Sequence, residues 1–375
     1  MKVDGADPEV TREVCSYCPK LCRQACPAAL AEGSEQATPT FKQQVAFQAQ
    51  TGERPLDPAR ARALYKCCDC EATVPACRHR VSVATSLRDA RAGAVEQGVA
   101  PPEVEWLRQR FLVHGSPYSV DLRRRAQGGR PRPGLTGVMP ACTALAHDTG
   151  SLPRVMRLLD LADVHITTAL PDPPCCGYPL DAAGLDDAFR AHAQQVADAL
   201  AGFPVLAVQG GACAWTMAVR YAQIGVRLAP RVRPLVDVLA EHAPRYRRLV
   251  ADAALAAGQA SEAPVYAYHD PCFLGRRLAR VEQPREVLRA ISGRAPRELG
   301  YHGRETVCTG GGGVYPLTHP DAARACGRRL GDLFRETGAD VLVTGCPSAA
   351  RRLKLAEPEL PVQTLDEALE ARLLG

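Results

Sequence analysis

The segment ADVLVTGC at residues 339–346 has the form of a buried parallel strand that ends at a cysteine, and the class of fold follows from this pattern. Upstream, VYAYH at residues 265–269 predicts a second strand, which ends at Pro271-Cys272. Between the two strands, residues 321–337 predict an amphipathic helix that follows Pro320. Its apolar residues recur at helical spacing and are Ala322, Ala325, Leu330, Leu333 and Phe334. Strands that alternate with helices indicate parallel α/β units.

The same arrangement of strands and cysteines occurs once more, earlier in the chain. The predicted pairs are Gly137–Met139 with Cys142, Val164–Ala169 with Cys175 and Cys176, and Pro204–Val208 with Cys213. The spacing agrees, since 38 positions separate Cys175 from Cys213 and 38 separate Cys308 from Cys346. Each unit spans about 130 residues, the size of a domain. The cysteines follow the carboxyl ends of strands, where open α/β sheets bind ligands.

The region before the repeat has a different pattern. Arg60–Tyr65 and Ser86–Gln97 look helical, and residues 1–115 show no clear strand pattern. Residues 116–135 contain Arg123-Arg124-Arg125, Gly128-Gly129 and PRPG, which is typical of a basic linker with a solvated arginine face. Docking of an acidic partner is the alternative role for these arginines. We therefore expect an α/β protein with a helical region at 1–115, a linker, and repeated units at 136–260 and 261–375.

The strongest local motif is CSYCPKLCRQACP at residues 15–27. Bacterial ferredoxins hold iron–sulfur clusters with C-x2-C-x2-C-x3-C-P, and here the second gap has three residues instead of two. A tight loop of this kind aims three thiolates at one cluster. Pairs of the form CxxC also suit tetrahedral zinc, but the final Cys26-Pro27 favours an iron–sulfur cluster.

A second cysteine run, CCDCEATVPAC, occupies residues 67–77, with Thr73 at the third ligand position. In two-cluster ferredoxins, the fourth cysteine of each run ligates the other cluster. A first [4Fe-4S] cluster would then have the complete ligand set Cys15, Cys18, Cys22 and Cys77. A second would take Cys26, Cys67 and Cys70 and lack one ligand. Cys68 either supplies that ligand through a shift of the loop or is merely buried. Without it, the second cluster is three-iron, labile or absent.

Composition restricts the class of protein. Hydrophobic residues make up 46% and charged residues 23% of the 375 residues, which excludes a disordered chain. The net charge of +5 is too small to indicate a nucleic-acid partner. The N-terminus has no apolar run typical of a secretory signal, and no stretch of about 18 apolar residues predicts a membrane span. We expect a cytoplasmic protein, where thiols stay reduced, and metal binding best accounts for its 16 cysteines.

With both halves considered, the chain resembles the iron–sulfur subunits of the heterodisulfide reductase type, which include those of glycolate and lactate oxidases. Their pattern is a two-cluster ferredoxin-like region followed by two cysteine-rich CCG domains. The likeness rests on both N-terminal cysteine runs, on DPPCCGYPL at 172–180, on CTGGGG at 308–313 and on TGCPS at 344–348. It implies a helical ferredoxin-like domain, a first CCG domain at 136–260 and a degenerate second one at 261–375.

The family pattern C…CCG…CxxC implies the metal ligands of the two CCG domains. The first domain retains Cys142, Cys175, Cys176 and Cys213, with Thr216 at the fifth position, and four thiolates suffice for an iron–sulfur cluster or zinc. The second retains Cys272, Cys308 and Cys346, with Thr309 and Ala349 at the remaining positions.

Three further features of the second domain need interpretation, namely His269, Cys326 and the glycines at 310–313. His269 either completes the metal site or caps a strand end by hydrogen bonding to the backbone, and we favour the cap. Cys326 falls on the apolar face of the predicted helix, so we assign it to the core. The glycines at 310–313 permit close backbone approach to a cluster or a ligand. Phosphate is the other candidate ligand, although no Lys-Ser/Thr follows and the segment is no P-loop.

The resemblance implies an electron-transfer subunit that relays electrons from a flavin-dependent dehydrogenase, or another redox partner protein, to a quinone or other carrier. No G-x-G-x-x-G follows a strand, so the dehydrogenase would be a separate chain, and any membrane association would be peripheral, through a partner. Reduction of a heterodisulfide or another thiol–disulfide at a CCG-bound cluster is the first alternative, although neither domain keeps all five cysteines. A non-redox metal-binding scaffold is the second. The sequence assigns no catalytic residue.

Overall fold

The computed structural model describes residues 8–126, 136–164, 166–167, 175–256 and 262–374. It contains two four-stranded sheets, and every strand pairing in both is parallel. The first sheet has the order β2-β1-β3-β4 and the second the order β6-β5-β7-β8, so the two correspond strand for strand. The strands are β1 (Thr136–Met139), β2 (Ile166–Thr167), β3 (Val205–Val208), β4 (Arg231–Pro234), β5 (Tyr266–His269), β6 (Arg297–Glu298), β7 (Val341–Thr344) and β8 (Val362–Thr364). The prediction of parallel α/β units is confirmed.

Register brings the central strands of each sheet to a common carboxyl edge. Met139 of β1 lies beside Val208 of β3, and His269 of β5 lies beside Thr344 of β7. Each of these four strands is followed within a few residues by a cysteine. The short strands β4, β6 and β8 were not predicted, because they have few apolar residues and their pattern is weak. Of the predicted strand 164–169, residues 165, 168 and 169 lie outside the described residues.

Helices connect the strands in both units. In the first unit they are α8 (Cys142–His147), α9 (Ser151–Leu161), α10 (Tyr178–Ala183), α11 (Asp186–Leu200), α12 (Gly211–Trp215), η3 (Thr216–Arg220), α13 (Tyr221–Gln223), α14 (Leu235–Glu241) and α15 (Ala243–Ala256). In the second they are η4 (Phe273–Arg277), α16 (Glu282–Ser292), η5 (Gly303–Glu305), α17 (Tyr315–Thr318), α18 (Pro320–Arg335), α19 (Pro347–Ala356) and α20 (Leu365–Leu374). The helix predicted over 321–337 is therefore α18.

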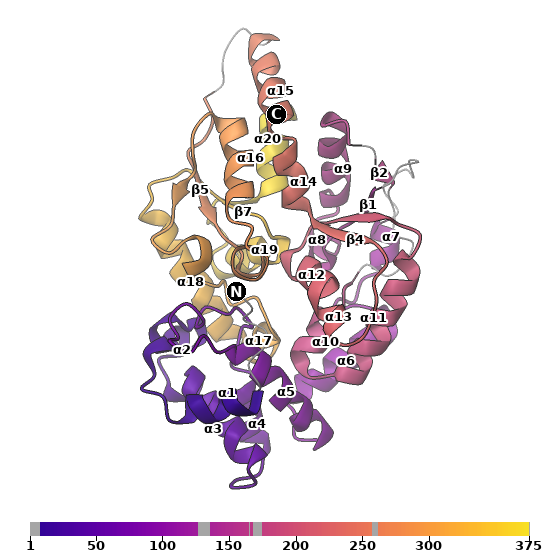
Figure 1. Cartoon of the computed structure of the whole chain (residues 1–375). Coiled ribbons are helices and arrows are strands. Elements are labelled where there is room, and N and C mark those ends of the chain that lie inside the picture. The colour runs from indigo at the N-terminus through magenta and orange to yellow at the C-terminus, as the bar shows by residue number, and fades with distance from the viewer. Residues whose placement is uncertain (1–7, 127–135, 165, 168–174, 257–261, 375) are drawn as a thin grey trace.

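The last helices of the two units pack across onto the opposite unit. The C-terminal helix α20 lies against α9, while α14 and α15 lie against α16 (Figure 1). Arg154 of α9 pairs with Asp366 at 3.1 Å and with Glu370 at 3.0 Å, both on α20. This exchange holds the two sheets in a fixed relation.

The N-terminal region is helical, and its described residues 8–126 contain no strand. Its helices are α1 (Pro8–Ser16), η1 (Leu21–Ala25), α2 (Pro27–Glu32), η2 (Glu35–Ala37), α3 (Pro39–Gln50), α4 (Pro58–Leu64), α5 (Val83–Glu96), α6 (Pro102–His114) and α7 (Leu122–Ala126). The predicted helices at 60–65 and 86–97 correspond to α4 and α5. Both begin earlier than predicted, because the Asp57 and Ser82 side chains accept hydrogen bonds from the first-turn amides.

The expected basic linker is wrong for residues 122–126, which form α7. Leu122 and Ala126 are buried, and Arg125 donates from Nη1 to the Leu145 carbonyl at 3.0 Å and to the Ala146 carbonyl. A guanidinium at the end of α8 satisfies carbonyls that have no partner within the helix. Arg123 and Arg124 are exposed, whereas Gly128-Gly129 and PRPG lie outside the described residues.

Buried ion pairs join the N-terminal region to both units. Arg88 of α5 pairs with Asp69 at 3.0 Å and with Asp181 of α10 at 3.0 Å, and all three side chains are buried. Arg277 of η4 pairs with Glu71 at 3.0 Å. Removing one member of a buried pair leaves an uncompensated charge, so these contacts make separation of the three parts costly.

We expect Arg88→Ala to destabilise the protein by about 3–5 kcal/mol, because it leaves two buried carboxylates short of a partner. Chemical denaturation followed by circular dichroism measures this change. The matched control is Arg108→Ala, which breaks the exposed pair with Glu105 and should change stability by less than about 0.5 kcal/mol. Equal effects of the two substitutions would contradict a junction held by buried charge.

Candidate metal centre

Four thiols from the two N-terminal runs line one small cavity. They are the predicted ligands of the first cluster, Cys15, Cys18, Cys22 and Cys77, and Thr73 also lines this cavity. Much of the remaining wall is apolar, including Val14, Pro39, Val81 and Val83. Burial, reinforced by the neighbouring thiols, raises the pKa of Cys15 to about 12 and that of Cys22 to about 11. Four converging thiols in an apolar setting fit an iron–sulfur cluster, whose binding would favour the thiolate form.

The longer second gap of the first motif is accommodated by the backbone at Lys20. This residue adopts a left-handed conformation with φ of 67° and precedes η1, which begins at Leu21 and carries Cys22. The turn lets Cys22 line the same cavity as Cys15 and Cys18 despite the additional residue.

A second group of buried thiols combines cysteines from the N-terminal region and the second sheet unit. Its members are Cys26, Cys68, Cys70, Cys308 and Cys326, packed around the Tyr315 side chain. The Cys68 thiol hydrogen-bonds with those of Cys308 and Cys326, which lowers its pKa, and Cys308 also contacts Cys272. The group therefore lies at the boundary between two parts of the chain.

The assignment of Cys326 to the core is confirmed, since it belongs to a buried core cluster, and the structure adds which residues surround it. The side chain is buried on α18, as predicted, but its neighbours are the thiols of Cys68, Cys70 and Cys26. Helical spacing shows that a residue faces inward and does not show what covers it. The sequence held one signal for these neighbours, because Cys326 is a cysteine outside every motif and the ligand set expected for a second N-terminal cluster lacks one member.

Cys67 occupies a different environment from its neighbours in the motif. It packs at the edge of the main hydrophobic core and is not a member of the second thiol group. Its carbonyl accepts a hydrogen bond from Arg91 at 3.4 Å, and burial raises the pKa of its thiol to about 12. The ligand role expected for Cys67 stays a prediction.

The loop at residues 67–71 is clamped from both sides. Asp69 and Glu71 both have φ of 55°, a left-handed conformation on each side of Cys70. From η4, Arg276 donates to the Cys70 carbonyl at 2.6 Å and Arg277 to the Asp69 carbonyl at 3.3 Å. These contacts fix the loop that carries Cys68 and Cys70.

The glycines at 310–313 press against this same loop. A Cβ atom on Gly312 would lie 2.1 Å from the Cys68 carbonyl oxygen, and one on Gly313 would lie 2.5 Å from that of Cys67. Gly313 also has φ of 62°. These glycines thus allow close approach to the backbone that carries the N-terminal cysteines, and the expected approach to a cluster or a ligand stays a prediction.

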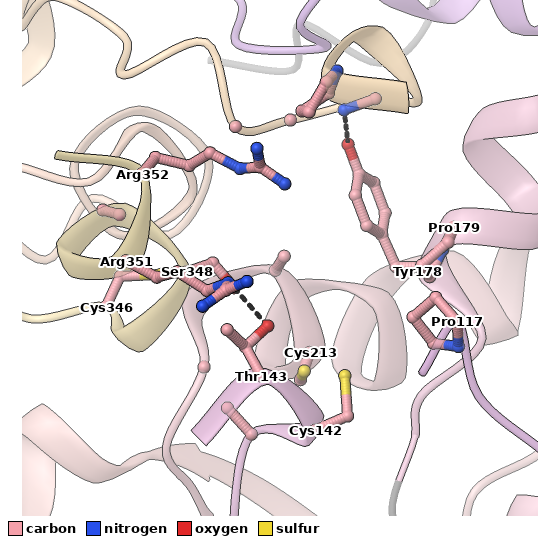
Figure 2. Close-up of a pocket in the computed structure, with 18 of the residues that line it drawn as sticks. Pro117, Cys142, Thr143, Tyr178, Pro179, Cys213, Cys346, Ser348, Arg351 and Arg352 are labelled. Atoms are coloured by element: carbon pink, nitrogen blue, oxygen red, sulfur yellow. Dashed lines mark hydrogen bonds between the residues drawn. The ribbon is translucent and has the colours of Figure 1, made fainter. Parts of the chain in front are cut away.

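A larger cavity of about 440 Å³ lies where the carboxyl edges of the two sheets meet. All seven cysteines expected to bind metal in the two CCG domains line it, namely Cys142, Cys175, Cys176, Cys213, Cys272, Cys308 and Cys346. Figure 2 shows Cys142 and Cys213 across from Arg351 and Arg352 of α19. Thr143 and Ser348 share a hydrogen bond of 2.8 Å, which joins the two units at the cavity wall (Figure 2).

The thiols of the first unit form one contiguous set. Cys175 hydrogen-bonds with Cys142 and Cys176, and Cys176 also with Cys213. These contacts and burial raise the pKa of Cys175, whereas hydrogen bonds from its neighbours lower that of Cys176. The Tyr221 hydroxyl donates to the Cys176 carbonyl at 2.8 Å and fixes the backbone there. Within the described residues, no three His, Cys, Asp or Glu side chains form a group that could hold a single metal ion.

His269 uses both ring nitrogens within the fold. Nδ1 lies 3.1 Å from Thr344 Oγ1, and Nε2 lies 3.1 Å from the Val307 carbonyl oxygen. Burial lowers the pKa of His269 to about 4, so the imidazole is neutral near pH 7. These contacts support the interpretation of His269 as a strand-end cap.

The thiol groups follow one another through the molecule. Cys26 interacts with Cys22 on one side and with Cys68 and Cys70 on the other. Interactions between thiols continue this series. They link Cys68 to Cys308, Cys308 to Cys272, Cys272 to Cys346 and Cys346 to Cys213. A line of adjoining thiol groups therefore connects the two cavities, because Cys26 follows Cys22 in the same motif and Cys308 belongs to the second group and also lines the large cavity.

Comparison with known proteins gives a consistent picture. Residues 266–353 match the family model for the CCG cysteine-rich domain. The chain is 24% identical over 350 residues to one subunit of the fumarate reductase (CoM/CoB) of Methanothermobacter marburgensis, covering 89% of this chain and 66% of that protein. It is 25% identical over 303 residues to one subunit of the dihydromethanophenazine:CoB–CoM heterodisulfide reductase of Methanosarcina acetivorans, covering 77% and 72%.

A third relative matches a shorter segment. The chain is 43% identical over 105 residues to a probable membrane-anchored ferredoxin of Chromohalobacter salexigens, which covers 28% of this chain and 15% of that protein. The resemblance to iron–sulfur proteins of the heterodisulfide reductase type is confirmed, and an iron–sulfur cofactor and an oxidoreductase role in electron transport are supported. None of the described helices is both long and apolar enough to span a membrane.

The contact between the glycine segment and the cysteine loop gives a testable prediction. Gly312→Ala should lower stability by about 1–3 kcal/mol or more, because the new methyl group overlaps the Cys68 carbonyl and overpacked sites must shift. Thermal unfolding measures the effect. Gly202→Ala is the matched control, since a Cβ atom there meets nothing within 4 Å. A Gly312→Ala protein as stable as this control would rule out the close contact.

Proposed function

We propose that the chain is an iron–sulfur electron-transfer subunit in which electrons move along the line of thiol groups. The observation that supports this proposal is the continuity of that line, from the Cys15 cavity through Cys26 and Cys68 to the cavity between the sheets. Unrelated structural thiols would not be expected to form adjoining groups from the N-terminal region to the cavity between the sheets. A relay needs neighbouring centres, and this arrangement supplies their ligands.

The residues of this chain would set the properties of each centre. A bound iron–sulfur cluster supplies one-electron redox chemistry, and the protein tunes its potential through ligands, hydrogen bonds and burial. We assign a [4Fe-4S] cluster to Cys15, Cys18, Cys22 and Cys77. We also assign Cys142, Cys175, Cys176 and Cys213 to a further iron–sulfur cluster. Cys272, Cys308 and Cys346 contribute thiols on the opposite side of the large cavity.

The partners proposed for the relay come from the sequence and the relatives. The names of two relatives identify them as subunits of reductases, which supports a redox partner protein for this chain. We propose a flavin-dependent dehydrogenase subunit as donor, a quinone or another carrier as acceptor, and a cytoplasmic location with peripheral membrane association through the partner. The large cavity is the proposed acceptor end.

Disulfide reduction is a second candidate function, favoured by the same cavity. It holds seven thiols beside Arg351 and Arg352, and one relative is named a heterodisulfide reductase subunit. Thr309 and Ala349 also line it, at positions where the family pattern has cysteine. We therefore expect the reduced protein to show no turnover with a heterodisulfide in the presence of a strong electron donor. Sustained turnover, followed as thiol release, would favour the reductase instead.

Iron content tests the electron-transfer proposal directly. Protein purified without oxygen should contain about 8 or more irons per chain with matching sulfide, and Cys18→Ala should lower this by about 4 as one cubane is lost. The electron paramagnetic resonance spectrum of the reduced protein should lose one component. Ser16→Ala is the matched control, because it lies on the same helix end and is not a proposed ligand. Zinc in place of iron, without visible absorbance, would indicate a metal-binding scaffold.

A further inference from the structure

We propose that Cys326 completes the second N-terminal cluster, which would then be held by Cys26, Cys68, Cys70 and Cys326. This inference rests on the proposed function, because it assumes that the chain binds iron–sulfur clusters. It replaces the incomplete set expected from the ferredoxin motif, in which Cys67 is a ligand and the fourth position is empty. The cluster would bridge the N-terminal region and the second sheet unit.

The surroundings of Cys326 support this ligand set. Its thiol hydrogen-bonds with that of Cys68, and its other thiol neighbours are Cys70 and Cys26. Cys308 also hydrogen-bonds with Cys68 and Cys70, but it contacts Cys272 as well and lines the large cavity, which Cys326 does not. Cys308 therefore belongs with the cavity thiols, while Cys326 faces the three N-terminal ones.

The four thiols are carried by segments that are each held by contacts with other parts of the chain. Cys26 directly precedes α2, and α18, which carries Cys326, packs against α2. The Cys326 Sγ atom lies 3.5 Å from the Pro27 carbonyl oxygen. Cys68 and Cys70 lie on the loop that Arg276 and Arg277 clamp. The four side chains thus converge from three segments that are separately fixed.

A buried cation beside these thiols is independent evidence for an anionic group. Lys42 is 1% exposed, and its ammonium lies 3.8 Å from Cys26 Sγ and 2.5 Å from the Lys66 carbonyl oxygen. In the described part of the chain, no carboxylate pairs with it. A buried ammonium without a counter-charge is strongly unfavourable. Thiolates of a bound cluster would provide that charge, whereas neutral thiols would not.

The alternative ligands for the second cluster fit less well. Cys67 packs at the edge of the main core and is not a member of the buried cluster that contains Cys26, Cys68 and Cys70, although it also lies near Lys42. Thr73, at the third position of the motif, lines the cavity of the first cluster. Neither side chain lies where the fourth ligand is needed, and Cys326 does.

The test compares Cys326→Ala with Cys67→Ala, both purified without oxygen. We expect Cys326→Ala to lose about 1 to 4 irons per chain, as the cluster becomes three-iron or is lost, whereas Cys67→Ala keeps the wild-type content. The spectrum of the first cluster, recorded in the same samples, reports whether the N-terminal region is folded. If Cys326→Ala does not fold, Cys326→Ser preserves the size of the side chain and should still alter or abolish the resonance of the second cluster.

The outcomes separate this inference from the proposed function. Wild-type protein without iron would contradict the proposed function itself. Wild-type protein that holds its clusters, with iron lost in Cys67→Ala and kept in Cys326→Ala, would overturn only the role of Cys326. A disulfide from Cys68 to Cys326 or Cys308, found by mass spectrometry of the untreated wild-type protein, would also overturn it.

Discussion

The structure depends on the clamping of one short loop, residues 67–71, among three parts of the chain. Asp69 and Glu71 pair with Arg88 and Arg277, which belong to the N-terminal region and the second sheet unit. Arg88 extends the network to Asp181 in the first unit, and the Tyr178 hydroxyl accepts a hydrogen bond from the Gly313 amide at 2.8 Å (Figure 2). Ionised groups without solvent need partners at fixed positions, so the network specifies how the three parts meet. The cysteines of the loop take their places from that arrangement.

The thiols impose a second requirement on the fold. Most of them are buried, and desolvation raises the pKa of thiols such as Cys15, Cys26 and Cys67. A buried cysteine side chain removes less apolar area from water than a larger aliphatic side chain does. It therefore contributes less hydrophobic stabilisation to the fold. Metal binding would stabilise the fold more than burial of the thiols alone, because the free energy of ligation to a folded site contributes directly to folding free energy. The cysteine groups are therefore best understood as sites that bind metal as the chain folds.

Much of the fold could be predicted from the sequence, because two physical patterns are strong. Buried parallel strands produce apolar runs such as VLVT at 341–344, and the cysteine that follows each run marks the ligand edge of the sheet. Strands such as β6 could not be predicted, since its two residues are both exposed and form no alternating apolar pattern. The thiol neighbours of Cys326 and the burial of Lys42 beside Cys26 could not be predicted, because both depend on which helix covers which face. Lys42 did carry a weak signal, as one of only five lysines in an arginine-rich chain.

The exchange of helices between the two sheet units has a mechanical consequence. Because α20 packs on α9 while α14 and α15 pack on α16, the sheets cannot hinge apart without unpacking both pairs (Figure 1). Opening or closing the slot between them would therefore require both helix pairs to unpack, unlike the closing clefts of many enzymes. For centres that exchange electrons across such a slot, rigid walls would limit the change in nuclear positions between oxidation states. The helix exchange would lower the reorganisation energy of the relay, and it would also restrict occupants of the slot to those that fit without opening it.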